Sequence, residues 1–297
     1  MRVYQVNAFV RRAAIVLACW LSIVAMSARI VIAQELQVDT ALLVSVDVSN
    51  SVDNDRYKLQ MEGIAKALED PGVIDAIISG PNGGILFAMV TWADRPALSL
   101  PWIKITSKEE ALAVAAKVRK LPLAGGEFTC MTKMLRSAND KIVPQIPAKA
   151  LRIVIDVSGD GIDNCNAEEP ITAVRDELVA NGVTINGLPI LEGANAGGAT
   201  ANDKPADAAL ADPVGLEEWF KTHVKGGNGS FVLSANGYGD FARAIRQKFV
   251  IEISGKPAAP RQFGARALEK RLVEVDGAVE TGRAIETERA VADTRID

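Results

Sequence analysis

Apolar segments recur along this chain, and each is too hydrophobic to leave one of its faces exposed to solvent. Residues 41–48, 84–92, 151–157 and 183–190 are almost continuously apolar, and segments with helical spacing separate them. A strand that is apolar on both faces has to be covered on both faces, which is typical of a parallel sheet between helices. The pattern therefore predicts an α/β domain over residues 38–254, with a doubly wound, mostly parallel central sheet and helices on both faces.

Helices are predicted where apolar residues share one face of a 3.6-residue repeat. These segments are 54–68, 107–119, 129–141, 170–180, 213–223 and 238–249. Ser107 and Glu110 have the spacing of a capping box, which supports the second helix. Two further segments, 97–102 and 230–233, are predicted as short strands, and 193–212 is interpreted as a surface insertion rich in Ala, Gly, Asn and Asp.

Both ends of the chain differ from this domain. Residues 1–33 combine N-terminal arginines, a short apolar run and small residues before Gln34, the pattern of a secretory signal peptide cleaved near Ala33. The apolar run is too short for a membrane anchor, and acylation of Cys19 is the alternative. Residues 255–297 are charged and Ala-rich and are interpreted as a disordered or loosely helical tail. We therefore expect an exported protein, periplasmic or secreted.

The charge balance excludes some partners. Removal of residues 1–33 leaves 29 basic against 37 acidic residues, a net charge of −8. An acidic surface argues against nucleic acid and against anionic membranes. No apolar run after residue 33 is long enough to span a bilayer.

Several familiar kinds of metal-binding and catalytic site do not fit this sequence. An EF-hand loop that began at Asp156 would place Ala167 where a bidentate carboxylate is required, and a strand precedes it. The single histidine, His223, leaves no zinc-ligand spacing, and we expect it to be structural or on the surface. The sequence also has no Gly-x-Ser-x-Gly elbow and no phosphate-binding loop that ends in Lys-Ser or Lys-Thr.

Hard oxygen ligands follow two of the predicted strands. Asp47, Ser49 and Ser51 come after the first strand, and Asp160 comes after a later one. Loops at the carboxyl ends of neighbouring parallel strands converge on one crevice. Hydroxyls with only two carboxylates favour Mg²⁺ or Mn²⁺, with Ca²⁺ as an alternative.

Asp47, Ser49 and Ser51 form an Asp-x-Ser-x-Ser sequence that resembles the metal-ion-dependent adhesion site of von Willebrand factor A-type domains. Thr129 matches that family's threonine ligand, and Asp160 before Gly matches its later aspartate. The stretches "TINGLPI" and "GGNGSFV" look like an exported bacterial branch of unknown function. The resemblance implies that Ser49, Ser51 and Thr129 bind the metal, that Asp47 and Asp160 hold metal-bound waters, and that one position stays open for a partner's carboxylate.

Alternatives to these residues exist in the sequence. Thr132 competes with Thr129, and Asp156 and Asp163 compete with Asp160. Ser and Asp after strands also serve as helix caps and turns. The threonine that the family often has before the later aspartate is missing here.

Two functions are compatible with the predicted site. The favoured one is a non-catalytic binding module that captures an acidic group of a protein partner through the metal. The alternative is a metal-dependent hydrolase or phosphatase, for which Glu127 and Asp163 are the candidate general bases. The sequence does not identify the partner or the oligomeric state.

Two cysteines remain after export, Cys130 and Cys165. The compartment is oxidising, so an even pair is expected to be bonded. Cys130 follows Thr129 directly, and Cys165 lies in the loop that carries Asp160. If both loops reach one metal, the cysteines are neighbours, and a disulfide between them is predicted.

Overall fold

The computed structural model describes residues 36–165, 168–192 and 213–255. The predicted signal peptide, the insertion 193–212 and the tail beyond Gly255 lie outside the described residues. No helix among the described residues has the length and apolar character that crossing a bilayer requires.

A five-stranded sheet forms the centre of the domain, in the order β3-β2-β1-β4-β5. Its strands are β1 (Gln37–Asp47), β2 (Ile85–Trp92), β3 (Pro96–Ile105), β4 (Lys149–Gly159) and β5 (Val183–Pro189). Strand β1 pairs in parallel with β2 and β4, β5 pairs in parallel with β4, and only the edge strand β3 is antiparallel to its neighbour. The predicted doubly wound, mostly parallel sheet is confirmed.

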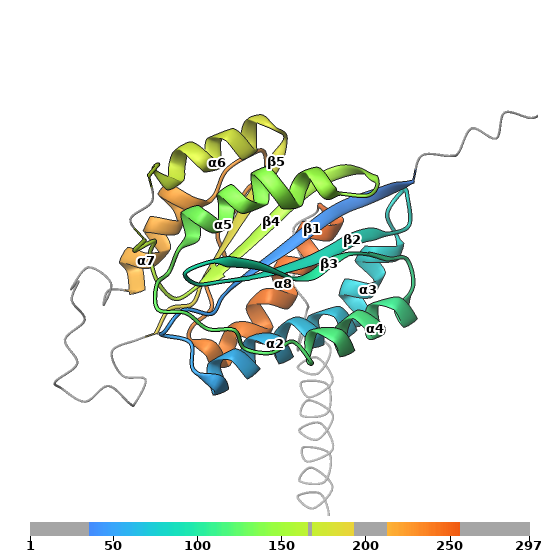
Figure 1. The fold of residues 1–297 in the computed structure, drawn as a ribbon. Helices are drawn as coiled ribbons and strands as arrows, with labels where there is room; N and C mark the ends of the chain where they lie inside the picture. Colours follow the sequence, from blue (N-terminus) through green and yellow to red (C-terminus); the bar gives the residue numbers. More distant parts are fainter. Residues whose placement is uncertain (1–35, 166–167, 193–212, 256–297) are drawn as a thin grey trace, which may run out of the picture. The chain divides into compact units, whose positions relative to one another are not determined.

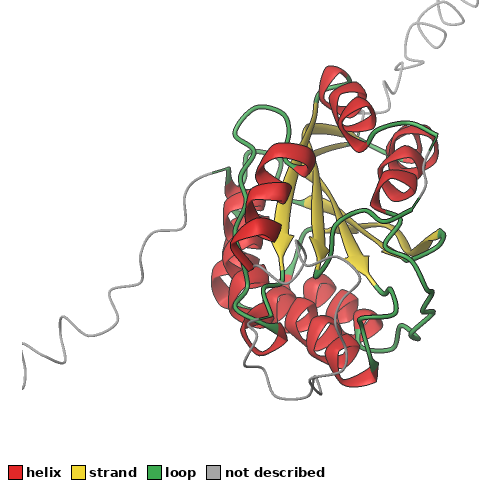
Figure 2. Ribbon diagram, turned by 90° about the vertical axis from the view of Figure 1, so that its left-hand side faces the viewer, coloured by secondary structure: helices red, strands yellow, loops and turns green. Residues whose placement is uncertain are grey.

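Helices cover both faces of this sheet (Figure 1; Figure 2). One layer contains α2 (Asn54–Glu69), α3 (Pro71–Ile78), α4 (Lys108–Val118) and α8 (Phe241–Ser254). The other contains α5 (Met131–Ser137), α6 (Ile171–Ala180) and α7 (Pro213–Trp219), with the π-helical turns η1 (Ala138–Ile142) and η4 (Phe220–Val224). Short 3₁₀ turns occur at η2 (Val143–Gln145) and η5 (Tyr238–Asp240).

The alternation of side chains in β1 explains why both layers form. Leu42, Val44 and Val46 pack with the α2 and α8 side, whereas Leu43 packs with the α5 and α6 side. All are buried, as expected for a strand with period-2 side chains between two helical layers. The sheet therefore separates the two largest clusters of core residues.

Three local predictions need correction. Helix α3, which Asp70 caps through its side chain, was not predicted, because its eight residues are too short to show a helical repeat. Residues 230–233 do not form a strand; among them only Val232 makes an isolated bridge, to Gly187 of β5. The helix predicted from Thr129 begins at Met131, so Thr129 stays in a loop.

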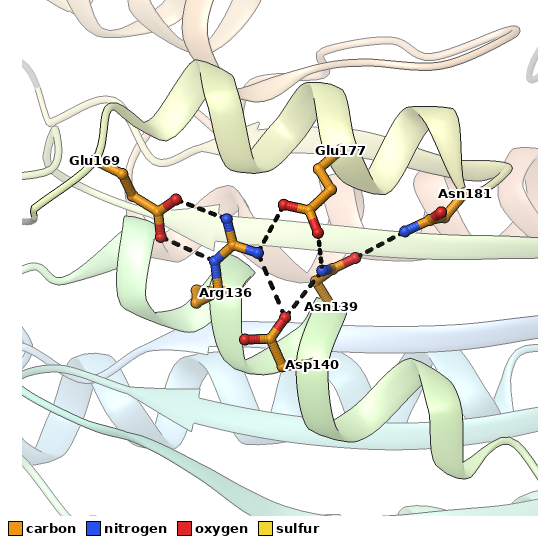
Figure 3. A network of polar contacts seen from close by, with 6 residues as sticks. All are labelled: Arg136, Asn139, Asp140, Glu169, Glu177 and Asn181. Carbon is orange, nitrogen blue, oxygen red and sulfur yellow. Dashed lines mark hydrogen bonds and ion pairs between the residues drawn. The ribbon is translucent and has the colours of Figure 1, made fainter.

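A polar network joins α5 and η1 to α6 (Figure 3). The Arg136 guanidinium donates to both oxygens of Glu169 at 2.8 and 2.6 Å and to Glu177 Oε2 at 2.7 Å. Asn139 donates to Glu177 Oε1 at 2.8 Å, and Asn181 donates to Asn139 at 3.2 Å. A bidentate, networked arginine fixes geometry better than an isolated surface pair does. The network therefore holds together two helices that follow loops of the candidate site.

The packing of α2 on α8 leads to a prediction about the substitution Gly63→Ala. A Cβ atom there would lie 2.8 Å from Phe241 Cδ1, although alanine in a helix is normally favoured over glycine by about 1 kcal/mol. Because overpacking costs roughly 1–3 kcal/mol, Gly63→Ala is expected to lower the free energy of unfolding by about 1 kcal/mol net. Gly239→Ala, which meets nothing within 4 Å, should be neutral or stabilising in the same urea titrations. A more stable Gly63→Ala protein would contradict the packing.

Candidate metal centre

The carboxyl end of β1 delivers a buried acid. Asp47 is the last residue of the strand, and its side chain is fully buried. Its Oδ1 accepts the backbone N–H of Ser49 at 2.8 Å, whereas its Oδ2 has no hydrogen-bond partner among the described residues. Burial, and then the charge of Asp160, raise the pKa of Asp47 to about 8. A carboxylate placed in this way is stabilised by a nearby cation.

Three hydroxyls and a second acid meet beside it. The Ser49 and Ser51 hydroxyl oxygens lie 3.3 Å apart, and the Thr129 hydroxyl donates to Ser49 Oγ at 3.3 Å. Ser51 Oγ donates to Asp160 Oδ1 at 2.7 Å. Ser49 and Thr129 are buried and Ser51 is exposed, so the cluster is open to solvent on one side. The structure thus brings together all five residues predicted as the metal site.

The donor set fits a hard divalent cation. The described residues contain no group of three or more His, Cys, Asp or Glu side chains that could hold a metal, so a site here depends on its hydroxyls. Hydroxyl and carboxylate oxygens are ligands of Mg²⁺ and Mn²⁺, which keep several waters. The unpartnered Oδ2 of Asp47 is the polar atom that a metal-bound water would satisfy.

The loop that carries Thr129 is tied to the loop that follows β4. The Thr129 backbone N–H donates to Asn164 Oδ1 at 2.7 Å, and the Asn164 N–H donates to the Thr129 carbonyl at 3.1 Å. A disulfide joins the next residues, Cys130 and Cys165, whose Cα atoms are 4.9 Å apart. Asn164 was not singled out from the sequence, because nothing local indicates that it pairs with a residue 35 positions away.

The alternative ligands have other contacts. Thr132 donates to Asp163 through its hydroxyl and, at 3.3 Å, through its backbone N–H, so these two residues satisfy one another. Asp156 is buried beside Lys248 of α8. His223 stacks on Trp219 with ring centroids 5.1 Å apart, a structural environment.

The structure adds a residue from the far end of the domain. The Tyr238 hydroxyl, in η5, donates to Asp160 Oδ2 at 2.9 Å, and burial raises the Tyr238 pKa. The Arg56 guanidinium lies 5.3 Å from the centre of the Tyr238 ring and pairs with Glu192 at 2.5 Å. Arg56 also donates to the Ser51 carbonyl oxygen. The spacing of residues 56, 160 and 238 along the sequence gives no indication that they are neighbours in the fold.

Residues 37–257 match the family described as "Protein of unknown function (DUF1194)". The chain belongs to this family. No curated protein sequence matches it.

Solved structures show the same fold. Proximal thread matrix protein 1 (PTMP1) from the mussel byssus superposes with a TM-score of 0.50 at 14% identity, over 74% of this chain and 48% of that chain. A "von Willebrand factor type A" structure from Catenulispora acidiphila gives 0.49 at 15% identity, over 73% of this chain and 43% of that one. BatB from Bacteroides thetaiotaomicron gives 0.47 at 15% identity, over 73% and 100%.

These likenesses concern the fold alone. The chain spans about half the length of the first of these proteins. Another structure of PTMP1 is described as having a "zinc occupied MIDAS motif", with a TM-score of 0.49. The strand order and the PTMP1 superposition agree with the resemblance to von Willebrand factor A-type domains, and the fold is of that type.

The cysteine pair leads to a testable prediction about free thiols. The denatured, unreduced chain without residues 1–33 should show no titratable thiol, whereas Cys130→Ala should expose one at Cys165. A bond across 35 residues is worth roughly 3–4 kcal/mol in the chain-entropy model, so the double alanine variant should unfold at lower denaturant concentration. Two reactive thiols in the wild-type protein would contradict the pairing.

Proposed function

We propose that this chain is an exported, non-catalytic binding module that uses a divalent metal to hold an acidic group of a protein partner. The observation that supports the proposal is the convergence of five oxygen-bearing side chains, among them buried Asp47, whose Oδ2 has no hydrogen-bond partner among the described residues. Export is supported by the signal-peptide pattern of residues 1–33.

Each residue has a defined part in this proposal. Ser49 and Ser51 would bind the metal through their hydroxyls, with Thr129 as a third ligand. Asp47 and Asp160 would hold metal-bound waters and orient the serines, as their hydrogen bonds to Ser49 and Ser51 suggest. When bound, the metal would supply an open coordination position for a carboxylate. Mg²⁺ and Mn²⁺ suit the donors.

The charge of the chain explains why a metal would be needed. Without residues 1–33 the net charge is −8, and Asp47 and Asp160 bring two acids to the site itself. An acidic partner would meet repulsion from such a surface. A divalent cation between the two sets of carboxylates turns this repulsion into attraction, so binding becomes conditional on the metal.

An exposed apolar side chain beside the site supports the proposal that the partner is a protein. Phe128, next to Thr129, is 45% exposed, and its backbone N–H donates to Asp94 Oδ1 at 2.7 Å. Asp94 also accepts the N–H of Glu127, so the exposed ring is held on a fixed backbone. Rigid exposed aromatics are typical anchors of protein interfaces. We expect Phe128 to contact the partner next to its metal-bound acid.

Metal binding should be visible as stabilisation. A ligand that binds only the folded state stabilises it by about 2.7 kcal/mol at a concentration 100-fold above its Kd. Mg²⁺ or Mn²⁺ should therefore raise the unfolding temperature, and EDTA should reverse the rise. Asp47→Asn and Ser51→Ala should abolish the effect, whereas Ser79→Ala, at an exposed serine away from the cluster, should keep it. Equal shifts in wild type and Ser51→Ala would argue against the site.

Partner capture should depend on the metal and on Phe128 separately. The immobilised domain should retain a protein from a native envelope extract in Mg²⁺ and release it in EDTA. Ser51→Ala should lose both the metal shift and the retention. Phe128→Ala should keep the metal shift and retain less partner, since it removes only the apolar contact. Retention that is unchanged by EDTA would rule out metal-mediated capture, even if the thermal shift were observed.

A further inference from the structure

A second polar cluster lies under helix α8, away from the metal centre. Lys248 of α8 is 0% exposed, and its neighbours Asp156 of β4 and Glu252 of α8 are 1% and 2% exposed. The Lys248 Nζ lies 2.8 Å from Glu252 Oε1 and 3.3 Å from Asp156 Oδ1. Asp156 therefore has Lys248 and Glu252 as its polar neighbours within the core. Three ionisable groups in a buried core are costly to desolvate, so their presence there calls for a reason.

The surroundings hold an amine against a carboxyl group in a buried pocket. The Phe231 ring covers Lys248 Nζ at 4.5 Å from its centre. Asn186 of β5 donates to Glu252 Oε1 at 2.9 Å, and its own carbonyl oxygen accepts the Phe231 N–H at 3.0 Å. Glu252 is therefore oriented by a fixed neighbour, whereas the Asp156 carboxyl group lies against Lys248 and Glu252.

Burial affects the protonation of Asp156 and Lys248 differently. Burial, reinforced by the charge of Glu252, raises the pKa of Asp156, which favours its neutral form. Burial lowers the pKa of Lys248, but the neighbouring acids Asp156 and Glu252 raise it overall, which favours the ammonium. Transfer of one proton from Lys248 to Glu252 would produce a neutral amine beside a neutral carboxylic acid. Low polarity makes this state accessible, because it disfavours separated charges.

We propose that Lys248 and Asp156 condense into an intramolecular amide bond, with Glu252 as the proton carrier. The Nζ lone pair attacks Cγ of the protonated Asp156 carboxyl group, a C–N bond forms, and the C–OH bond breaks. Two of the three ammonium protons leave Nζ: one departs with the hydroxyl as water, and the other remains on Glu252. No oxidant, reductant or co-reactant is needed.

Proximity favours this reaction over its uncatalysed counterpart. Groups held about 3–3.5 Å apart in an aligned geometry react as if at very high effective concentration. Asp156 is fixed by β4, which pairs on both sides with β1 and β5, and Lys248 is fixed by the packing of α8. Glu252 is closer to Nζ, but Asn186 holds its carboxylate, which suits proton transfer better than bond formation.

The bond would attach α8 covalently to the centre of the sheet. Helix α8 follows η5 directly, and η5 carries Tyr238, whose hydroxyl holds Asp160. The link would therefore anchor the segment that supports the metal centre. Its existence does not depend on metal binding or on a partner, so it is tested separately from the proposed function.

Measurement of the intact mass of the purified full chain tests whether the amide bond forms. After reduction and denaturation, the wild-type mass should be lower than the sequence mass by one water. Trypsin, which cleaves after lysine and arginine except before proline, should yield residues 153–175 joined to residues 247–261, with Lys248 uncleaved. A wild-type mass without the loss would overturn the proposal. A link from Lys248 to Glu252 within one peptide would overturn the assignment to Asp156.

Matched variants test the parts of the reaction. Lys248→Arg keeps the charge and cannot condense at this position, so the water loss should disappear. Asp156→Asn should condense with loss of ammonia and give the same linked mass as wild type. Glu252→Gln should leave most of the chain unlinked, and full linkage in it would refute the role of Glu252 as proton carrier. Asp163→Asn, an acid in the loop after β4, should link as wild type does.

Discussion

The parallel pairing of β1 with both β2 and β4 is the constraint on which the candidate site depends. Val46 of β1 lies opposite Ser158 of β4, so the two strands end at the same edge of the sheet. Asp47 and Asp160 are consequently delivered to one place from distant parts of the chain. The backbone hydrogen bonds of a central strand leave this register little freedom, because a shift by one residue would turn the apolar side chains of β1 to the wrong layer.

Sequence reasoning succeeded where the signal was local. Apolar runs identified four of the five strands outright, and Asp-x-Ser-x-Ser singled out Asp47, Ser49 and Ser51, which lie together at the end of one strand. It missed what depends on contacts between distant segments. Asn164 and Tyr238 hold Thr129 and Asp160 only because the fold brings their loops together. Residues 230–233 have strand-like composition, yet among them only Val232 makes an isolated bridge, since tertiary pairing overrides propensity.

The loops of the candidate site are restrained at several points. The disulfide and the paired hydrogen bonds of Asn164 join the Thr129 loop to the loop after β4. Further along the same two segments, Arg136 of α5 donates hydrogen bonds to Glu169 and to Glu177 of α6. Segments fixed at two points lose less conformational entropy when a ligand binds than free loops would. Such preorganisation suits a site made of hydroxyls, which are individually weak ligands.

The spacing of Asp156, Ser158 and Asp160 resembles a calcium loop, yet the sheet gives each residue a different environment. Asp156 is inside β4, where its neighbours across the layer are Lys248 and Glu252 of α8. Ser158 donates to the Ser45 carbonyl oxygen at 3.1 Å and so joins β4 to β1. Asp160 lies one residue beyond the strand, where hydroxyls of Ser51 and Tyr238 reach it. An acid inside the strand must find a cation in the core, whereas an acid at its end faces solvent and the other loops. The position of the sheet edge therefore separates the covalent chemistry proposed for Asp156 from the metal chemistry proposed for Asp160.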